Sequence, residues 1–221
     1  MPVVTIRGLL GSGAPELGKQ IAKKLGIDYV DREIIADVAN RIKWSKDGIA
    51  GKEMPAGTLL GRIAAALAHS YGVTGVYNDA YLPISETPLD DDQYLTGLKS
   101  VIKELADSDR VVIHGRGSQF ILKDLHGAVH LLIVAPLELR VKRVMASLNI
   151  NEENAKKEIE RFDSSRREFT KRYFHADLED SIYYDMVINT EHLSFRDATS
   201  IALDAISLKR KTSTKRSKKK Q

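Results

Sequence analysis

Short apolar runs that alternate with helix-like segments constrain the fold of this 221-residue chain more than any other feature. The runs RVVIH, from Arg110, and VHLLIVA, from Val129, are typical of strands buried on both faces of a sheet. Strands separated by helices imply parallel pairing with right-handed crossovers. The sequence therefore predicts an α/β fold, a five-stranded parallel sheet flanked by helices, with strands at 3–7, 28–31, 110–114, 129–135 and 185–189.

Apolar residues at helical spacing predict the helices that connect these strands. Leu17, Ile21 and Leu25 share one face of the first helix, which Pro15 opens and Gly26 ends. The stretch 44–90 has weak periodicity apart from one apolar segment, and we interpret it as an insertion. The predicted helices lie at 15–25, 31–43, 58–71, 95–105, 119–123, 136–148, 152–174 and 195–208.

Charge divides the chain into two unequal parts. The formal net charge is +4, yet residues 209–221 alone hold eight basic residues and no acidic one, so residues 1–208 carry −4. We expect residues 1–208 to form a single domain and the basic tail to be disordered. The alternative for the tail is contact with nucleic acid or an anionic lipid surface.

The cellular context is predicted only in outline. Cysteine is absent, which excludes disulfides and thiolate zinc sites. The N-terminal residues MPVVTIRGLL do not resemble a signal peptide, and no run approaches eighteen apolar residues. The expected protein is therefore cytoplasmic and not inserted in a membrane, and its oligomeric state is left open.

A glycine-rich turn, GLLGSGAP from Gly8, joins the first predicted strand to the first predicted helix. Its glycines let backbone N–H groups approach an anion, and the helix N-terminus behind them favours negative charge. The spacing is that of a Walker A loop, but its lysine and hydroxyl positions hold alanine and proline, which removes a phosphate-binding cation and a Mg²⁺ ligand. The predicted nucleotide-binding residues are Gly8, Gly11, Ser12, Gly13 and Ala14.

Several motifs occur in a characteristic order over residues 3–206. They are GSG followed by a helix, LGIDYVDREII, VVIHGRGSQFIL, LLIVAPLELRVKRVM, an arginine-rich helix and YYDMVINTEHLS. In this order they resemble the cytidylate kinase-like proteins, a nucleoside monophosphate kinase branch of the P-loop fold. The resemblance implies a substrate-side helical insertion at about 44–90, an arginine-rich lid at about 150–178, ATP and Mg²⁺ as cofactors, and nucleotides as small-molecule partners.

The resemblance also suggests substrate-binding residues. Arg116 matches the family's arginine after the third core strand and would meet the substrate phosphate, the alternative being a salt bridge with Asp109 or Asp124. Asp31 matches an aspartate near the family's substrate and metal, although it is equally well placed to cap the helix that it precedes.

Arginines on two later helices match the family's lid. Of these, Arg161 and Arg166 are the predicted catalytic residues, because bidentate donors stabilise the charge of a transferring phosphoryl group. Arg140 and Arg143 belong to the same lid pattern. The alternative for all four is ordinary pairing with nearby acidic residues on a charged helix.

The chain also departs from the family pattern. His114 stands where cytidylate kinases carry an aspartate, the family's substrate arginine near Asp37 is missing, and the metal ligands are unknown. The favoured function is transfer of the ATP γ-phosphate to CMP or dCMP. The alternatives are a nucleotide-binding module or sensor without turnover, and a Rossmann-type dinucleotide-binding protein.

Overall fold

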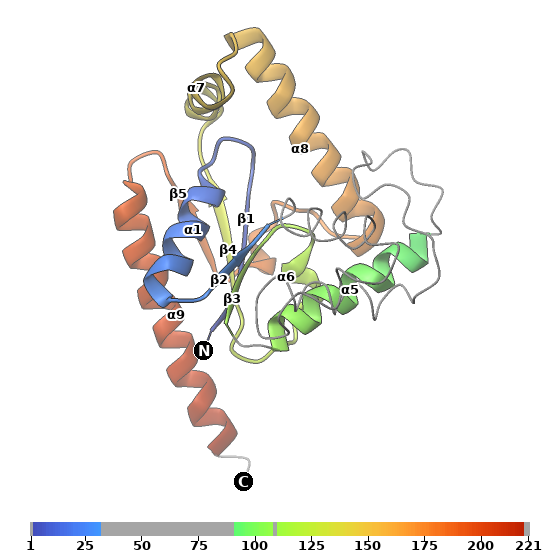
Figure 1. The fold of residues 1–221 in the computed structure, drawn as a ribbon, viewed down its shortest axis with the longest axis vertical. Helices are drawn as coiled ribbons and strands as arrows, with labels where there is room; N and C mark the ends of the chain where they lie inside the picture. The colour runs from blue at the N-terminus through green and yellow to red at the C-terminus, as the bar shows by residue number, and fades with distance from the viewer. Residues whose placement is uncertain (1, 32–90, 108–109, 219–221) are drawn as a thin grey trace, which may run out of the picture.

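A computed structural model describes residues 2–31, 91–107 and 110–218. Five strands form one sheet, and every pair of neighbours is parallel. The sheet has the order β2-β3-β1-β4-β5 (Figure 1) and consists of β1 (Val3–Gly8), β2 (Asp28–Val30), β3 (Val111–His114), β4 (Val129–Val134) and β5 (Met186–Asn189). The predicted five-stranded parallel sheet is confirmed.

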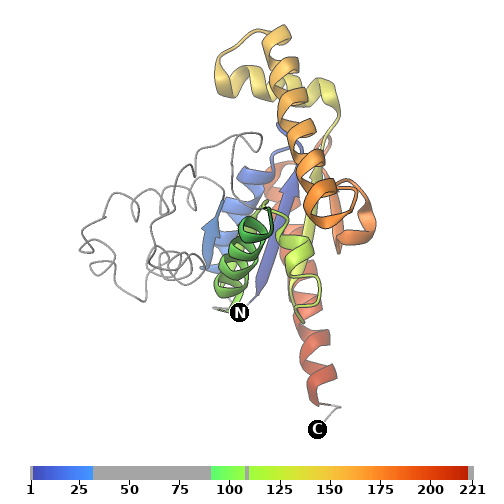
Figure 2. The same cartoon turned by 90° about the vertical axis from the view of Figure 1, so that its right-hand side faces the viewer.

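Helices cover both faces of the sheet. One face packs against α1 and α9, and the other against α5, α6 and the C-terminal part of α8 (Figures 1 and 2). The helices are α1 (Ala14–Leu25), α5 (Asp91–Asp107), α6 (Ser118–Ile121), α7 (Leu137–Leu148), α8 (Glu152–Phe174) and α9 (Phe195–Lys218), with a 3₁₀ turn η1 (Ser181–Tyr183) before β5. Within the described residues, no helix is both long and apolar enough to cross a membrane.

The strand order does not match the dinucleotide-binding arrangement. In a Rossmann fold the second strand of the chain pairs with the first. Here β3 lies between β1 and β2, with Val4 beside Val112 and Tyr29 also beside Val112. The topology of the described strands therefore argues against the Rossmann-type alternative.

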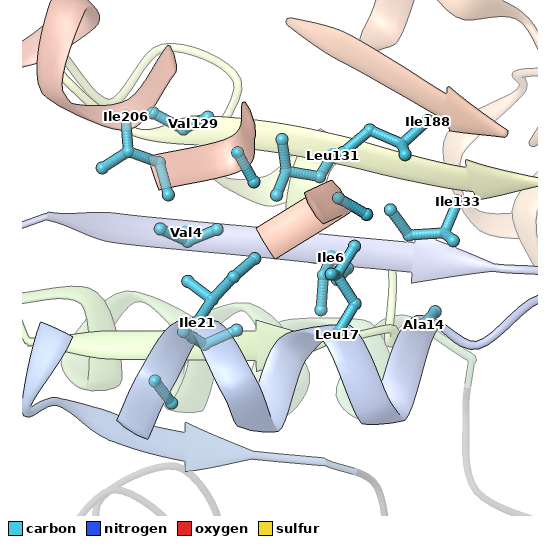
Figure 3. Close-up of a cluster of buried hydrophobic side chains, with 14 of the residues drawn as sticks. Val4, Ile6, Ala14, Leu17, Ile21, Val129, Leu131, Ile133, Ile188 and Ile206 are labelled. Carbon is cyan, nitrogen blue, oxygen red and sulfur yellow. The ribbon is translucent and has the colours of Figure 1, made fainter. Parts of the chain in front are cut away.

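The central strand β1 is buried on both faces, which explains its β-branched sequence. Val4 and Ile6 face α1 and α9, where Leu17 and Ile21 pack against them (Figure 3). Side chains alternate along a strand, so Val3, Thr5 and Arg7 belong to the opposite face. This pattern places a charged side chain at the carboxyl end of an otherwise apolar strand.

A smaller hydrophobic cluster lies apart from the sheet. Val141 and Val144 of α7 pack against Ala155 and Ile159 of α8, and Leu10 from the glycine loop adds to this cluster. Figure 2 shows α7 and the N-terminal part of α8 projecting beyond the carboxyl ends of the strands. The projecting part of the helix pair therefore has its own core and contacts the glycine loop, while the C-terminal part of α8 packs on the sheet.

Helix α9 differs most from the sequence-based expectation. It runs to Lys218, ten residues past the predicted end at Leu208, where the sequence analysis expects a disordered tail. Residues 209–218 contain no glycine or proline and include six lysines and arginines, which favour helix. The other predicted boundaries of described elements differ by at most four residues, and both ends of α8 agree. The helices expected at 31–43 and 58–71 and the insertion at 44–90 lie outside the described residues, apart from Asp31 itself.

Candidate functional site

The glycine loop between β1 and α1 has a backbone that other residues would strain. Gly11 and Gly13 have φ angles of 80° and 90°, in the left-handed region that favours glycine. A Cβ atom on Gly11 would lie 2.7 Å from the carbonyl oxygen of Arg140, and one on Gly13 would overlap the ring of Phe195. Both the torsion angles and the space therefore require glycine at these positions.

A buried ion pair fixes one side of this loop. The backbone N–H of Leu10 donates to Oδ1 of Asp163 at 3.1 Å, and Nε of Arg140 donates to the carbonyl oxygen of Leu10 at 3.1 Å. Arg140 and Asp163 pair with each other at 2.5 Å, and both side chains are buried. Helices α7 and α8 together hold the loop through its backbone, so Arg140 is a structural residue of the loop and not an exposed lid arginine.

A second arginine holds the next two carbonyl groups of the loop. Arg143 donates to the carbonyl oxygens of Gly11 and Ser12, both at 3.2 Å, and to Oγ1 of Thr190 at 2.8 Å. Thr190 in turn donates to the carbonyl oxygen of Ser12 at 2.8 Å. Arg143, like Arg140, therefore acts on the loop backbone.

These contacts leave three N–H groups of the loop available. Within the described part of the chain, no hydrogen bond involves the backbone N–H of Gly11, Gly13 or Ala14. Gly13 caps the N-terminus of α1, where the helix dipole is positive. Free donors at a helix N-terminus form an anion site of the kind that phosphate groups occupy. Of the predicted residues, Gly11, Gly13 and Ala14 thus have N–H groups available, whereas the N–H of Ser12 donates to the carbonyl oxygen of Leu9 at 3.0 Å. Phosphate binding by this loop stays a prediction.

A second turn lies beside this loop, at the carboxyl end of β3. Gly115, Arg116 and Gly117 all have positive φ angles, of 80°, 58° and 66°. The N–H of Gly115 donates to the carbonyl oxygen of Ile6 at 3.0 Å, which places the turn next to the end of β1. A left-handed conformation costs a residue with a side chain roughly 1–2 kcal/mol, and such strain is often found at functional sites.

Arg116 is therefore located where the sequence analysis expects it, at the crevice beyond the carboxyl ends of the strands. Of its two alternative partners, Asp109 lies outside the described residues, and Asp124 takes part in none of the ion pairs that the described residues form. Its role in phosphate binding stays a prediction.

The end of β3 has a cationic environment. His114 shares a hydrogen bond of 3.1 Å with the hydroxyl group of Tyr29 through Nδ1. Burial, together with the charges of Arg7, Arg166 and Lys19, lowers the pKa of His114 to about 3. His114 is thus neutral at pH 7 amid three cations from different elements. An anionic ligand would be favoured at this edge of the sheet.

Of the two predicted catalytic arginines, only Arg166 lies near this edge. Its guanidinium stacks on the ring of Phe162, and its charge acts on His114. Arg161 instead pairs with Glu158 at 2.7 Å, and its side chain is 76% exposed. Asp31 directly follows β2 at the same edge of the sheet. The catalytic and substrate-binding roles of these residues remain predictions.

Arg7, the last side chain of β1 before the loop, is not among the site residues predicted from the sequence. Its side chain is buried, with 4% relative exposure, and Nη1 donates to the carbonyl oxygen of Gly8 at 2.9 Å. Nη2 is buried and has no hydrogen-bond partner. Burial lowers the pKa of Arg7 to about 10, so the group remains charged at neutral pH. The sequence did contain a signal for this residue, because an arginine at the end of an apolar strand indicates a charged group at the sheet edge.

Comparison with known proteins identifies the family. A family model described as "Cytidylate kinase-like family" matches residues 3–192. This chain belongs to the cytidylate kinase-like family. The match covers most of the chain and includes the glycine loop, Arg116, and the two arginines that hold the loop, Arg140 and Arg143.

Individual relatives are distant. A cytidylate kinase of Sulfolobus acidocaldarius is 31% identical over 109 residues, which cover 49% of this chain and 59% of that protein. One of Pyrobaculum aerophilum is 28% identical over 205 residues and 92% of both chains. The fold is also similar to an uncharacterized protein of Eubacterium ventriosum, with a TM-score of 0.66, 18% identity, and 94% of this chain and 99% of that one covered. The last similarity shows the fold alone.

Membership of this family implies the use of ATP and Mg²⁺, and the described residues fit these two groups unequally. The loop offers free N–H donors to a phosphate. In contrast, no group of three or more acidic or histidine residues that could hold a metal occurs among the described residues. Pro15 occupies the Walker hydroxyl position, and Glu16 beside it is exposed. The described residues therefore include unbonded N–H groups at the start of α1 but no set of metal ligands.

Proposed function

We propose that the protein is a nucleoside monophosphate kinase that transfers the γ-phosphate of ATP to CMP or dCMP. The observation that carries this proposal is the loop, whose carbonyl groups are held by arginines and whose N–H groups are left for a ligand. The preference for a cytidine nucleotide rests on the names of the two relatives reported above, which are both cytidylate kinases.

The two turns suggest a division of labour between donor and acceptor. The N–H groups of the loop would hold the phosphates of ATP, and Arg116, beside the end of β1, would hold the phosphate of the acceptor. An oxygen of the acceptor phosphate attacks the γ-phosphorus while the bond to the bridging oxygen breaks and ADP leaves. The acceptor oxygen is already anionic, so the reaction depends on positioning and charge more than on a general base.

Arginine side chains would supply positive charge to the transferring group. Arg166 already approaches the end of β3, and Arg161 would need to leave Glu158 to join it. Mg²⁺, when bound, shields phosphate charge, and here it would be held by the nucleotide and water more than by the described side chains. Preorganised donors of this kind stabilise transition-state charge.

A second candidate is a nucleotide-binding module without turnover. Ala14 and Pro15 support it, because they remove the cation and the hydroxyl of a Walker A loop, and Ala14 is buried. Such a protein would bind nucleotides with the same loop and would release no ADP.

An assay of ADP release with ATP, CMP and Mg²⁺ separates the two candidates. For a kinase we expect ADP release that depends on CMP. In Arg116→Ala we expect kcat/KM to fall at least about 100-fold while the unfolding temperature stays unchanged. Arg110→Ala is the matched control, because this exposed arginine precedes β3, at the opposite end of the strand from Arg116, and donates to the carbonyl oxygen of Gly26. Stabilisation by both nucleotides without ADP release would instead favour the binding module.

A further inference from the structure

Arg7 is a buried cation without a counter-ion of its own. None of the ion pairs that the described residues form includes it. The two carboxylates whose charges reach it already pair elsewhere, Asp163 with Arg140 and Glu179 with Arg167. A buried charge destabilises a protein unless it is paired, so an uncompensated one needs an explanation.

The helix that packs against β1 contains further polar atoms without partners among the described residues. Helix α6 packs against β1 and begins with Ser118 and Gln119, whose Oγ and Oε1 atoms are buried and form no hydrogen bond. Nε2 of Gln119 donates to the hydroxyl group of Tyr184 at 3.2 Å, and this hydroxyl donates to the carbonyl oxygen of Leu178 at 2.6 Å. Tyr184 lies close enough to Arg7 for the ionisation of either side chain to affect the pKa of the other.

Burial also keeps Tyr184 uncharged. It raises the pKa of Tyr184 to about 12, so the phenol is neutral at pH 7. Arg7 therefore interacts with a neutral phenol, whose partner Gln119 and the adjacent Ser118 begin the helix that packs against β1. None of the ion pairs of the described residues commits a carboxylate to Arg7. Such a set of groups suits an oxygen-rich anion that arrives from outside.

We propose that Arg7 binds the phosphate of the acceptor nucleotide, with Oγ of Ser118 as a second donor. The inference rests on the proposed function and extends it by one binding residue. The acceptor is favoured over the donor because Arg7 belongs to the sheet face opposite α1 and immediately follows Ile6, which bonds to the turn of Arg116. The two guanidinium groups would thus serve one phosphate from two adjacent strand ends.

The proposal predicts opposite effects on the free and the liganded protein. Replacing Arg7 with methionine removes an uncompensated buried charge while it keeps most of the side-chain volume. The free protein should then unfold at an equal or higher temperature. The variant should at the same time lose much of its affinity for phosphate-bearing ligands.

The test measures binding of CMP, and separately of inorganic phosphate, by calorimetry and thermal unfolding in Arg7→Met, with Arg110→Met as the matched control. We expect Kd for CMP to rise at least about 30-fold in Arg7→Met and to stay unchanged in Arg110→Met. Unchanged binding of both probes by Arg7→Met, or a lower unfolding temperature of the free variant, would overturn the proposal. Arg7→Lys keeps the charge, and failure of both variants to fold would also assign Arg7 a structural role.

The outcome can be separated from that of the proposed function. If the natural protein binds CMP and phosphate through Arg7 but releases no ADP, the kinase fails and the assignment of Arg7 stands. If the natural protein phosphorylates CMP and Arg7→Met does so with the same KM, the assignment fails and the kinase stands.

Discussion

Asp163 joins the helix pair α7–α8 to the glycine loop through a single carboxylate. One oxygen accepts from the N–H of Leu10 and the other pairs with Arg140, in surroundings that exclude water. A buried pair of this kind contributes little net stability, but removal of one partner leaves the other charged and buried. The energetic importance of each residue is therefore visible only when its partner is present.

The variant Arg140→Met tests this dependence. We expect the free energy of unfolding to fall by about 3–5 kcal/mol, because Asp163 would remain as an unpaired buried carboxylate. Urea denaturation measures the change. The double variant Arg140→Met/Asp163→Leu should recover part of the loss, and a single-variant loss below about 1 kcal/mol would contradict the buried clamp.

Single side chains were predicted well where the signal is local and poorly where it is not. The turn around Arg116 follows a strand directly, so its place at the sheet edge could be inferred from the sequence. The partners of Arg140 could not, because Leu10 and Asp163 lie 130 and 23 positions away along the chain. Only the folded chain shows that this arginine holds the loop.

The loop as an element depends on two glycines that meet other parts of the protein. We expect Gly13→Ala to lower the free energy of unfolding by about 3 kcal/mol, because it combines a left-handed φ angle with overlap with the ring of Phe195. Gly26→Ala is the matched control: it has a φ angle of 63° but no atom within 4 Å, so about 1 kcal/mol is expected. Urea denaturation of both variants provides the comparison, and equal losses would show that the contact with Phe195 is unimportant.

At the scale of helices and strands, periodicity and apolar runs predicted most of the described fold. All five strands are present, and the sequences of β1, β3 and β4 suit their burial on two faces. Strand β5 at the sheet edge is more exposed, with Val187 44% exposed. The predicted end of α9 was wrong. Residues 209–218 continue the helix, but this charged segment has no apolar stripe from which periodicity could predict a helix. Helix propensity, more than packing, describes that part of the sequence.

The stability of the whole molecule should depend on pH through a buried histidine. His130 of β4 shares a hydrogen bond of 2.8 Å with Oγ1 of Thr5, and burial lowers its pKa to about 4. The unfolded chain has a histidine pKa near 6.5, so it takes up a proton before the folded protein does. The stability that this difference provides is fully present above about pH 6.5 and is lost as pH falls towards 4.

We expect the free energy of unfolding to fall by up to about 1.4 kcal/mol per pH unit from His130 over this range. His114, whose pKa is lowered further, adds to the same slope. Urea denaturation at several pH values should show a smaller slope in His130→Gln and the natural slope in His192→Gln, whose imidazole is exposed. An unchanged slope in His130→Gln would show that His130 titrates normally in the folded protein.

The carbonyl groups of Leu10, Gly11 and Ser12 are bonded to side chains of α7 before any ligand arrives. The backbone of the loop has thus already lost the freedom that a flexible segment would surrender on binding. If the loop binds phosphate as proposed, the ligand would meet donors that need no rearrangement. The rate of capture would then be set by diffusion and by attraction to the cations at the strand ends, without a slow ordering of the loop.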